Sequence, residues 1–363
     1  ERIETLFDIA GICDSIGNRD RQLSALRQAQ EYAHLLENDA FVMRAFIGLG
    51  RLAAVTGDVD NAAVHLDAAL ALAGRVDDAA LHFEAHFYRG DLAARSGRLD
   101  AAHEQFQSAY DLARSREDTT REARALRGLG IVARLKGNLS EALDLIERAL
   151  ALQTTGGDLF GASVTWTNRL AVRYDLGSWD RLLAQAVEAL ALKERLGARH
   201  GAAIIRHMQG MAACSLGDFD RAAAALPMAE QEFIAVQDRR TAGLARNVLG
   251  LVAESEGRLD DARQDYEAAL DRAEATGATT EAAYARHDLG ALLARSARPL
   301  DAVPLLEAAQ APWQEQDNDL LRLKSEAWLG LALMPAGHER AAALADGRSE
   351  EHTSELQSHY SIS

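Results

Sequence analysis

The chain has 363 residues, a formal net charge of −16 and only 6% aromatic residues. This acidic balance disfavours direct binding to nucleic acid, because contact with phosphate backbones relies on clustered Lys and Arg. Cys13 and Cys214 lie far apart, with no CxxC or Cys/His spacing, so we expect neither a disulfide framework nor a zinc site. Because no apolar run reaches about 18 residues, we also expect no membrane span and a cytoplasmic protein.

The two ends of the chain differ from its middle. Helical periodicity is already present at Ile3, Leu6 and Ile9, and position 1 is Glu rather than Met, so we expect a fragment of a longer protein. Residues 348–359 read RSEEHTSELQSH, which resembles the translation of a common sequencing-library adapter. We therefore expect residues 1–347 to form one folded solenoid, and residues 348–363 to be a disordered tail of artificial origin.

Small residues recur every forty positions. The first column holds glycines, interrupted by Leu170: Gly50, Gly90, Gly130, Gly210, Gly250 and Gly290. A second glycine column follows seven residues later: Gly17, Gly57, Gly97, Gly137, Gly177, Gly217, Gly257 and Gly337. A third column is alanine throughout: Ala69, Ala109, Ala149, Ala189, Ala229 and Ala269. The period predicts about nine structural units, of which the first and last are incomplete.

Each column has a structural reason. A glycine inside a helix costs about 1 kcal/mol relative to alanine, so we expect the first column to permit close approach of the next helix through its small facing alanines. The second column is typical of a left-handed residue that ends a helix, followed by capping residues such as Asp58, Asn138 and Asp218. Each unit is therefore predicted to be a helical hairpin, and stacked hairpins share a continuous core.

The segment LGLVAESEGRLDDARQDYEAAL, residues 249–270, resembles the tetratricopeptide repeat (TPR). The resemblance implies an all-α fold, a right-handed α-solenoid of tandem hairpins. That repeat has a period of 34 residues, and we expect the six extra residues per unit to extend the helices and widen the turns between hairpins. Pro227 and the prolines between residues 299 and 312 predict local kinks.

The resemblance also implies that the first helix of each hairpin lines a concave surface that binds a protein or peptide. The positions expected to face it are Phe87, Tyr88, Arg127, Arg134, Asn168, Tyr174, His207, Asn247, His287 and Asp288. Aromatic residues stand early in this series and polar ones later, which suits a peptide with an apolar and a polar end. The alternative is that aromatic residues such as Phe87 fill the core between hairpins.

A catalytic centre is not visible in the sequence. The glycines recur at the repeat period and do not form a phosphate-binding loop after a strand. His82 and His86 stand one helical turn apart and could share a metal, but a third ligand is lacking, and a polar helix face is the simpler interpretation. We therefore expect a non-enzymatic protein without cofactor or metal.

The Ala- and Arg-rich forty-residue units are similar to the C-terminal arrays of bacterial LuxR-type, SARP-type and STAND-type ATPase transcriptional regulators. This resemblance implies the sensor part of a larger signal-transduction or transcription regulator, with an ATPase domain in the same chain as a candidate partner. Two alternatives stay open. One is a free-standing adaptor or scaffold for complex assembly, and the other is a metal-dependent enzyme that uses the histidine pair.

Overall fold

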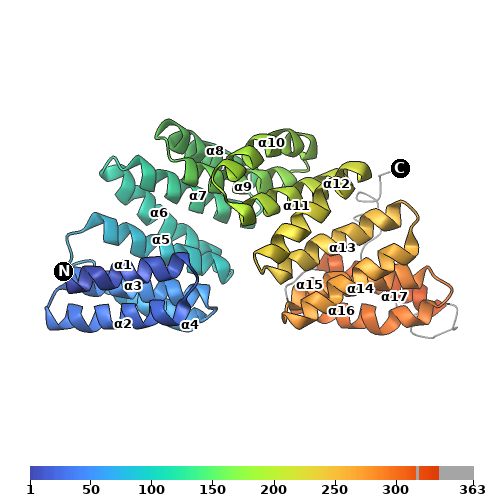
Figure 1. Cartoon of the computed structure of the whole chain (residues 1–363), viewed down its shortest axis with the longest axis horizontal. Coiled ribbons are helices and arrows are strands. Elements are labelled where there is room, and N and C mark those ends of the chain that lie inside the picture. The colour runs from blue at the N-terminus through green and yellow to red at the C-terminus, as the bar shows by residue number, and fades with distance from the viewer. Residues whose placement is uncertain (316–318, 335–363) are drawn as a thin grey trace. The chain divides into compact units, whose positions relative to one another are not determined.

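The computed structural model describes residues 1–315 and 319–334, and these residues form seventeen α-helices, one 3-10 helix and no strand. The chain divides into two compact units, residues 1–177 and 178–363. Within each unit, consecutive helices pack against one another in chain order (Figure 1). The predicted all-α, solenoid-type architecture is confirmed.

The first unit contains four complete hairpins and the first helix of a fifth. Its helices are α1 (Arg2–Ser15), α2 (Arg19–Leu35), α3 (Asp39–Val55), α4 (Val59–Ala71), α5 (Ala79–Arg95), α6 (Leu99–Ser115), α7 (Thr119–Leu135), α8 (Leu139–Thr155) and α9 (Leu159–Asp175). Odd-numbered helices are the first helices of the hairpins, and the glycines of the first column lie inside them.

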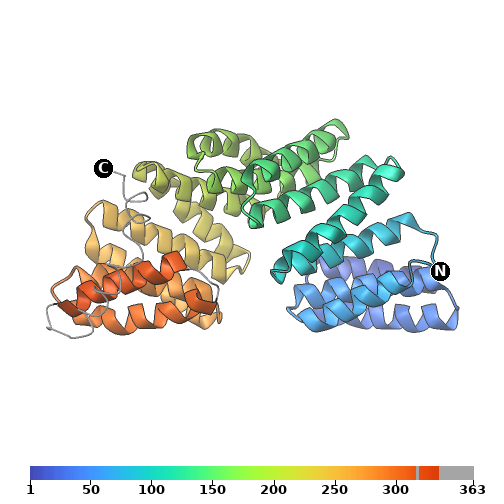
Figure 2. The same cartoon turned by 180° about the vertical axis from the view of Figure 1, so that it is seen from behind.

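The second unit continues the alternation and is visible from the opposite side in Figure 2. Its helices are α10 (Trp179–Arg195), α11 (Arg199–Ser215), α12 (Phe219–Ala235), α13 (Arg239–Ser255), α14 (Leu259–Ala275), α15 (Thr279–Ala294), the 3-10 helix η1 (Pro299–Ala302), α16 (Val303–Glu315) and α17 (Asp319–Leu333).

The first glycine column makes room for a large side chain from the second helix of the same hairpin. A Cβ atom at Gly50 would lie 2.6 Å from Cγ of Leu66, and one at Gly250 would lie 2.5 Å from Cε1 of Tyr266. Gly90, Gly130, Gly210 and Gly290 stand in the same relation to buried residues sixteen positions later: Phe106, Ile146, Leu226 and Leu306. The second helix also approaches through alanines, since a Cβ atom at Gly50 would lie 3.4 Å from the carbonyl oxygen of Ala62 and one at Gly130 would lie 3.3 Å from that of Ala142. The alanine column, Ala69 to Ala269, is itself fully or almost fully buried.

The helices are joined by short turns. Gly57 lies in the turn between α3 and α4 with φ +83°, a left-handed conformation that glycine adopts without steric cost. Asp58 caps α4 by accepting a hydrogen bond from the amide of Asn61 at 3.2 Å. Asn138 holds the equivalent place before α8, but its side chain makes no capping bond. Most turns between hairpins also have three residues, for example 156–158. The six extra residues per unit therefore lengthen the helices, and the expected widening of the turns was wrong.

Pro227 and Pro299 have different effects on the helices that contain them. Pro227 lies within α12, which continues as one helix from Phe219 to Ala235. Pro299 begins the 3-10 helix η1, which replaces the first turn of a regular second helix. Gly337 and the adapter-like residues 348–359 lie outside the described residues.

Candidate functional site

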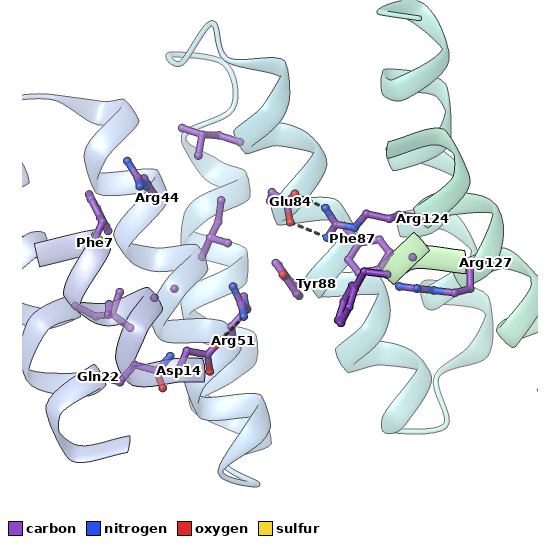
Figure 3. Close-up of a pocket in the computed structure, with 18 of the residues that line it drawn as sticks. Phe7, Asp14, Gln22, Arg44, Arg51, Glu84, Phe87, Tyr88, Arg124 and Arg127 are labelled. Atoms are coloured by element: carbon purple, nitrogen blue, oxygen red, sulfur yellow. Dashed lines mark hydrogen bonds and ion pairs between the residues drawn. The ribbon is translucent and has the colours of Figure 1, made fainter. Parts of the chain in front are cut away.

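The first unit contains a pocket of about 730 Å³ (Figure 3). Residues from α1, α3, α5, α7 and the start of α9 line it, together with Gln22 and Leu26 of α2. The pocket therefore lies on the face formed by the first helices of the hairpins. Its size is within the range of roughly 300–1,000 Å³ that is usual for ligand pockets.

The carboxylates of the pocket are already engaged by other groups of the protein. Asp14 accepts a bond from Nη2 of Arg51 at 2.7 Å and another from Arg19. Burial raises the pKa of Asp14, but the hydrogen bond from Arg19 and the charge of Arg51 outweigh it, so this pKa is lowered. Asp158 caps α9 by accepting from the amide of Gly161 at 2.8 Å.

The third carboxylate, Glu84, forms a bidentate ion pair with Arg124. The two hydrogen bonds measure 2.6 and 3.0 Å, and dashed lines mark them in Figure 3. The Arg124 guanidinium also lies 4.6 Å from the centre of the Phe87 ring. Burial lowers the pKa of Arg124, but the bond to Glu84 outweighs burial and raises it. Arg124 is thus neutralised within the protein.

Arg127 lies one turn further along α7 and has no such partner. Its partly buried side chain extends from α7 toward the interior of the pocket (Figure 3), and it makes no hydrogen bond or ion pair with any described residue. Burial and the positive charge of Arg124 lower the pKa of Arg127. Asp91 and Asp158 oppose this effect from beyond ion-pair distance.

Phe87 and Tyr88 form the aromatic part of the pocket wall. Phe87 is 9% exposed and contacts the rings of Phe83 and Phe106, so it contributes to the core and to the pocket. The Arg51 guanidinium lies 4.9 Å from the Tyr88 ring centre, and burial raises the pKa of the Tyr88 hydroxyl. Phe160 also lines the pocket and is 72% exposed. Phe160 is not among the positions predicted from the sequence, although an aromatic residue two positions after the capping residue Asp158 could have indicated a ligand contact.

Three other predicted residues of the first unit do not line this pocket. Arg134 forms an ion pair with Asp175 at 2.8 Å. The Asn168 amide donates to the carbonyl oxygen of Val164 at 3.3 Å within its own helix. Tyr174 lies near the end of α9 and is partly buried. The structure therefore groups Phe87, Tyr88 and Arg127 and leaves Arg134, Asn168 and Tyr174 apart.

Of the predicted residues of the second unit, His207, Asn247 and His287 are buried and Asp288 is partly buried. Asn247 donates to the carboxylate of Asp288 at 2.6 Å, and Nδ1 of His287 lies 2.8 Å from the hydroxyl of Ser325. Burial raises the pKa of Asp288 to about 6, and it lowers the pKa of His287 and of His207 to about 4. A partner that used Asn247, Asp288 or His287 would have to displace these existing contacts.

The histidine pair of α5 does not extend into a larger cluster. His86 Nδ1 lies 2.9 Å from the side-chain oxygen of Gln105, and Nε2 of His82 is buried without a hydrogen-bond partner among the described residues. Within residues 1–315 and 319–334, no group of three or more His, Cys, Asp or Glu side chains is placed to hold a metal ion. No helix in these ranges is long and apolar enough to cross a membrane.

The sequence matches the family model of the tetratricopeptide repeat over residues 47–117, 111–156 and 207–279, which is just over half of the chain. The chain therefore belongs to the tetratricopeptide repeat family. It is a TPR-type module, a class of helical array that binds proteins on an extended surface. The comparison with curated protein sequences gave no match.

Several solved structures share the fold at low sequence identity. A Rap protein complexed with competence and sporulation factor superposes with a TM-score of 0.68 and 14% identity over 95% of both chains. The apo quorum sensor NprR from B. thuringiensis gives 0.65 and 14%, over 92% of this chain and 97% of that chain. A STAND protein with a tetratricopeptide repeat sensor, PH0952 from Pyrococcus horikoshii, gives 0.65 and 11%, over 93% of this chain and 53% of its own.

Proposed function

We propose that this chain is a non-enzymatic, cytoplasmic module that binds a peptide or a protein segment in the pocket of its first unit. The observation that carries the proposal is the pocket itself, which several first helices build together from aromatic and arginine side chains. Such side chains contribute most of the energy at many protein interfaces. Its volume suits a short segment rather than a folded domain.

The proposal includes a regulatory role as the sensor of a larger bacterial signal-transduction or transcription regulator, with an ATPase domain in the same chain as the candidate partner in cis. Two structural neighbours support it, since one is a quorum sensor and another is a STAND protein whose repeats are its sensor. The Rap neighbour, which is complexed with competence and sporulation factor, supports a binding role for an array of this fold.

Gly11 offers a direct test because it lines the pocket and a Cβ atom there would have no other atom within 4 Å. The Gly11→Trp variant should occupy part of the pocket and obstruct a ligand without a clash at its base, whereas Gly11→Ala should leave the pocket open. Peptides are selected on the full chain from a random display library, and their affinities are measured by fluorescence anisotropy.

We expect enriched peptides to bind the parent chain and Gly11→Ala alike, and to bind Gly11→Trp at least about tenfold more weakly. Thermal melting of both variants checks that each is folded. If no peptide is enriched, or if Gly11→Trp binds the enriched peptides as well as the parent does, the pocket is not the binding site.

A further inference from the structure

We infer that the pocket recognises a carboxylate of its peptide ligand, and that Arg127 is the side chain that binds it. This inference rests on the proposed peptide-binding function and adds the chemistry of the ligand. The carboxylate is either the C-terminal group of the peptide or the side chain of an Asp or Glu residue.

The charged side chains of the pocket leave one arginine without an ion-pair partner. Four arginines line it, Arg44, Arg51, Arg124 and Arg127, and three carboxylates accompany them. Arg51 is paired with Asp14, Arg124 with Glu84, and Arg44 with Glu4 at 2.7 Å, while Asp158 caps a helix. Arg127 alone among the four has no anionic partner. Arg127 is therefore the pocket arginine whose guanidinium no carboxylate of the described residues contacts, in a chain whose net charge is −16.

The two pocket arginines of α7 differ in their contacts. Arg124 and Arg127 are three residues apart and point to the same pocket, yet only Arg124 has a carboxylate within reach. A partly buried charge without a partner is unfavourable, and acidic residues outnumber basic ones in this chain by 55 to 39. A ligand carboxylate would supply the missing partner, because the planar guanidinium matches a carboxylate with two parallel hydrogen bonds.

The apolar part of the pocket wall indicates what should accompany the carboxylate. Phe87, Leu81 and Ile47 line the same pocket, and Phe87 and Ile47 present only small exposed parts of apolar side chains. A ligand that places an apolar side chain against these residues would bring its carboxylate into a partly desolvated site. There a charged hydrogen bond is stronger than in water.

The test uses the peptides selected on the full chain, each made with a free C-terminus, with an amidated C-terminus, and with each Asp or Glu replaced by its amide. Affinities are measured on the parent chain and on the Arg127→Gln and Arg127→Lys variants. Arg148→Gln is the matched control, since Arg148 is an exposed arginine of α8 that bonds to Tyr110 and does not line the pocket.

We expect neutralising one particular carboxylate to weaken binding to the parent chain about tenfold or more, the effect of losing a charged hydrogen bond. The same change should have little further effect in Arg127→Gln, so the two changes should not add. Arg127→Lys should recover part of the affinity, and Arg148→Gln should match the parent. Sensitivity to amidation would identify the C-terminus, and sensitivity to an Asp or Glu replacement would identify a side chain.

The inference is overturned if peptides excluded by Gly11→Trp bind Arg127→Gln as tightly as the parent, or if no single carboxylate matters. In that case the pocket would still be a peptide site, so the proposed function would stand. If no binding depends on Gly11, both the function and the inference fail.

Discussion

The same repeat position has opposite surroundings in the two units of the chain. Three residues before the first glycine column stand Arg127 in α7 and Asn247 in α13. Asn247 donates a hydrogen bond to Asp288 in the next repeat, 41 residues later. The residue 41 positions after Arg127 is Asn168, whose side-chain amide donates to the carbonyl oxygen of Val164 within its own helix.

The repeat thus fixes the position of a side chain, and contacts with the next repeat determine whether that side chain can bind a ligand. In the second unit, Asn247 with Asp288 and His287 with Ser325 form a polar seam, a part-buried and a buried contact between successive first helices. In the first unit, Arg127 receives no partner and lines a pocket. Three predictions test this difference.

The largest expected effect concerns Asp288, whose pKa burial raises from 3.8 to about 6. Between these pH values the folded chain keeps a proton that the unfolded chain releases, so this group favours the folded state at low pH and its contribution is lost as pH rises to 6. His207 and His287, with pKa values lowered to about 4, have the opposite effect, since their contribution is lost as pH falls from 6.5 to 4.

Asp288→Asn should therefore stabilise the chain by up to about 3 kcal/mol at pH 7.5, at 1.36 kcal/mol per pKa unit, and have almost no effect at pH 4. The amide can still accept the bond from Asn247. Urea denaturation at the two pH values measures both quantities. Equal effects at pH 4 and pH 7.5 would mean that Asp288 is not held in a desolvated seam.

A smaller effect should separate the two arginines of α7. Arg124→Met leaves the partly buried Glu84 with only the longer ion pair to Arg121, at 4.0 Å, and should cost about 2 kcal/mol. Arg127→Met removes an unpaired charge and should raise stability by about 1 kcal/mol. Chemical denaturation compares the two variants with the parent. A loss of stability in Arg127→Met equal to that in Arg124→Met would show that Arg127 has a partner inside the protein.

The smallest effect concerns the glycines inside the first helices, which occur in both units. Gly250→Ala places a Cβ atom 2.5 Å from the ring of Tyr266 and should cost about 1–2 kcal/mol by overpacking. Gly11→Ala meets no atom within 4 Å and should gain up to about 1 kcal/mol from helix propensity. Melting temperatures should thus shift in opposite directions. A stabilising Gly250→Ala would mean that Tyr266 can move aside easily.

The sequence was sufficient for the hairpins, because the glycine columns and apolar periodicity depend on contacts that recur in every unit. It was not sufficient for the turns, whose length was overestimated, because helix extension and turn widening leave the same period of forty residues. It pointed to Phe87, Tyr88 and Arg127, but it could not distinguish them from His207 or Asn247. That distinction depends on which partner the side chain of the next repeat takes: Asp288 accepts from Asn247, whereas Asn168 donates to a carbonyl oxygen of its own helix.

The insertion of Leu66 at Gly50, of Tyr266 at Gly250 and of their counterparts takes place inside single hairpins. The same side chains also pack against the following hairpin: a Cβ atom at Gly128 would lie 2.5 Å from the ring of Phe106, and Tyr266 belongs to one cluster with Leu289 and Leu292. A change of volume at one of these positions therefore affects both the partner sixteen residues away and the next repeat. Adjacent hairpins must consequently change together, which restricts the exchange of a single hairpin without its neighbour.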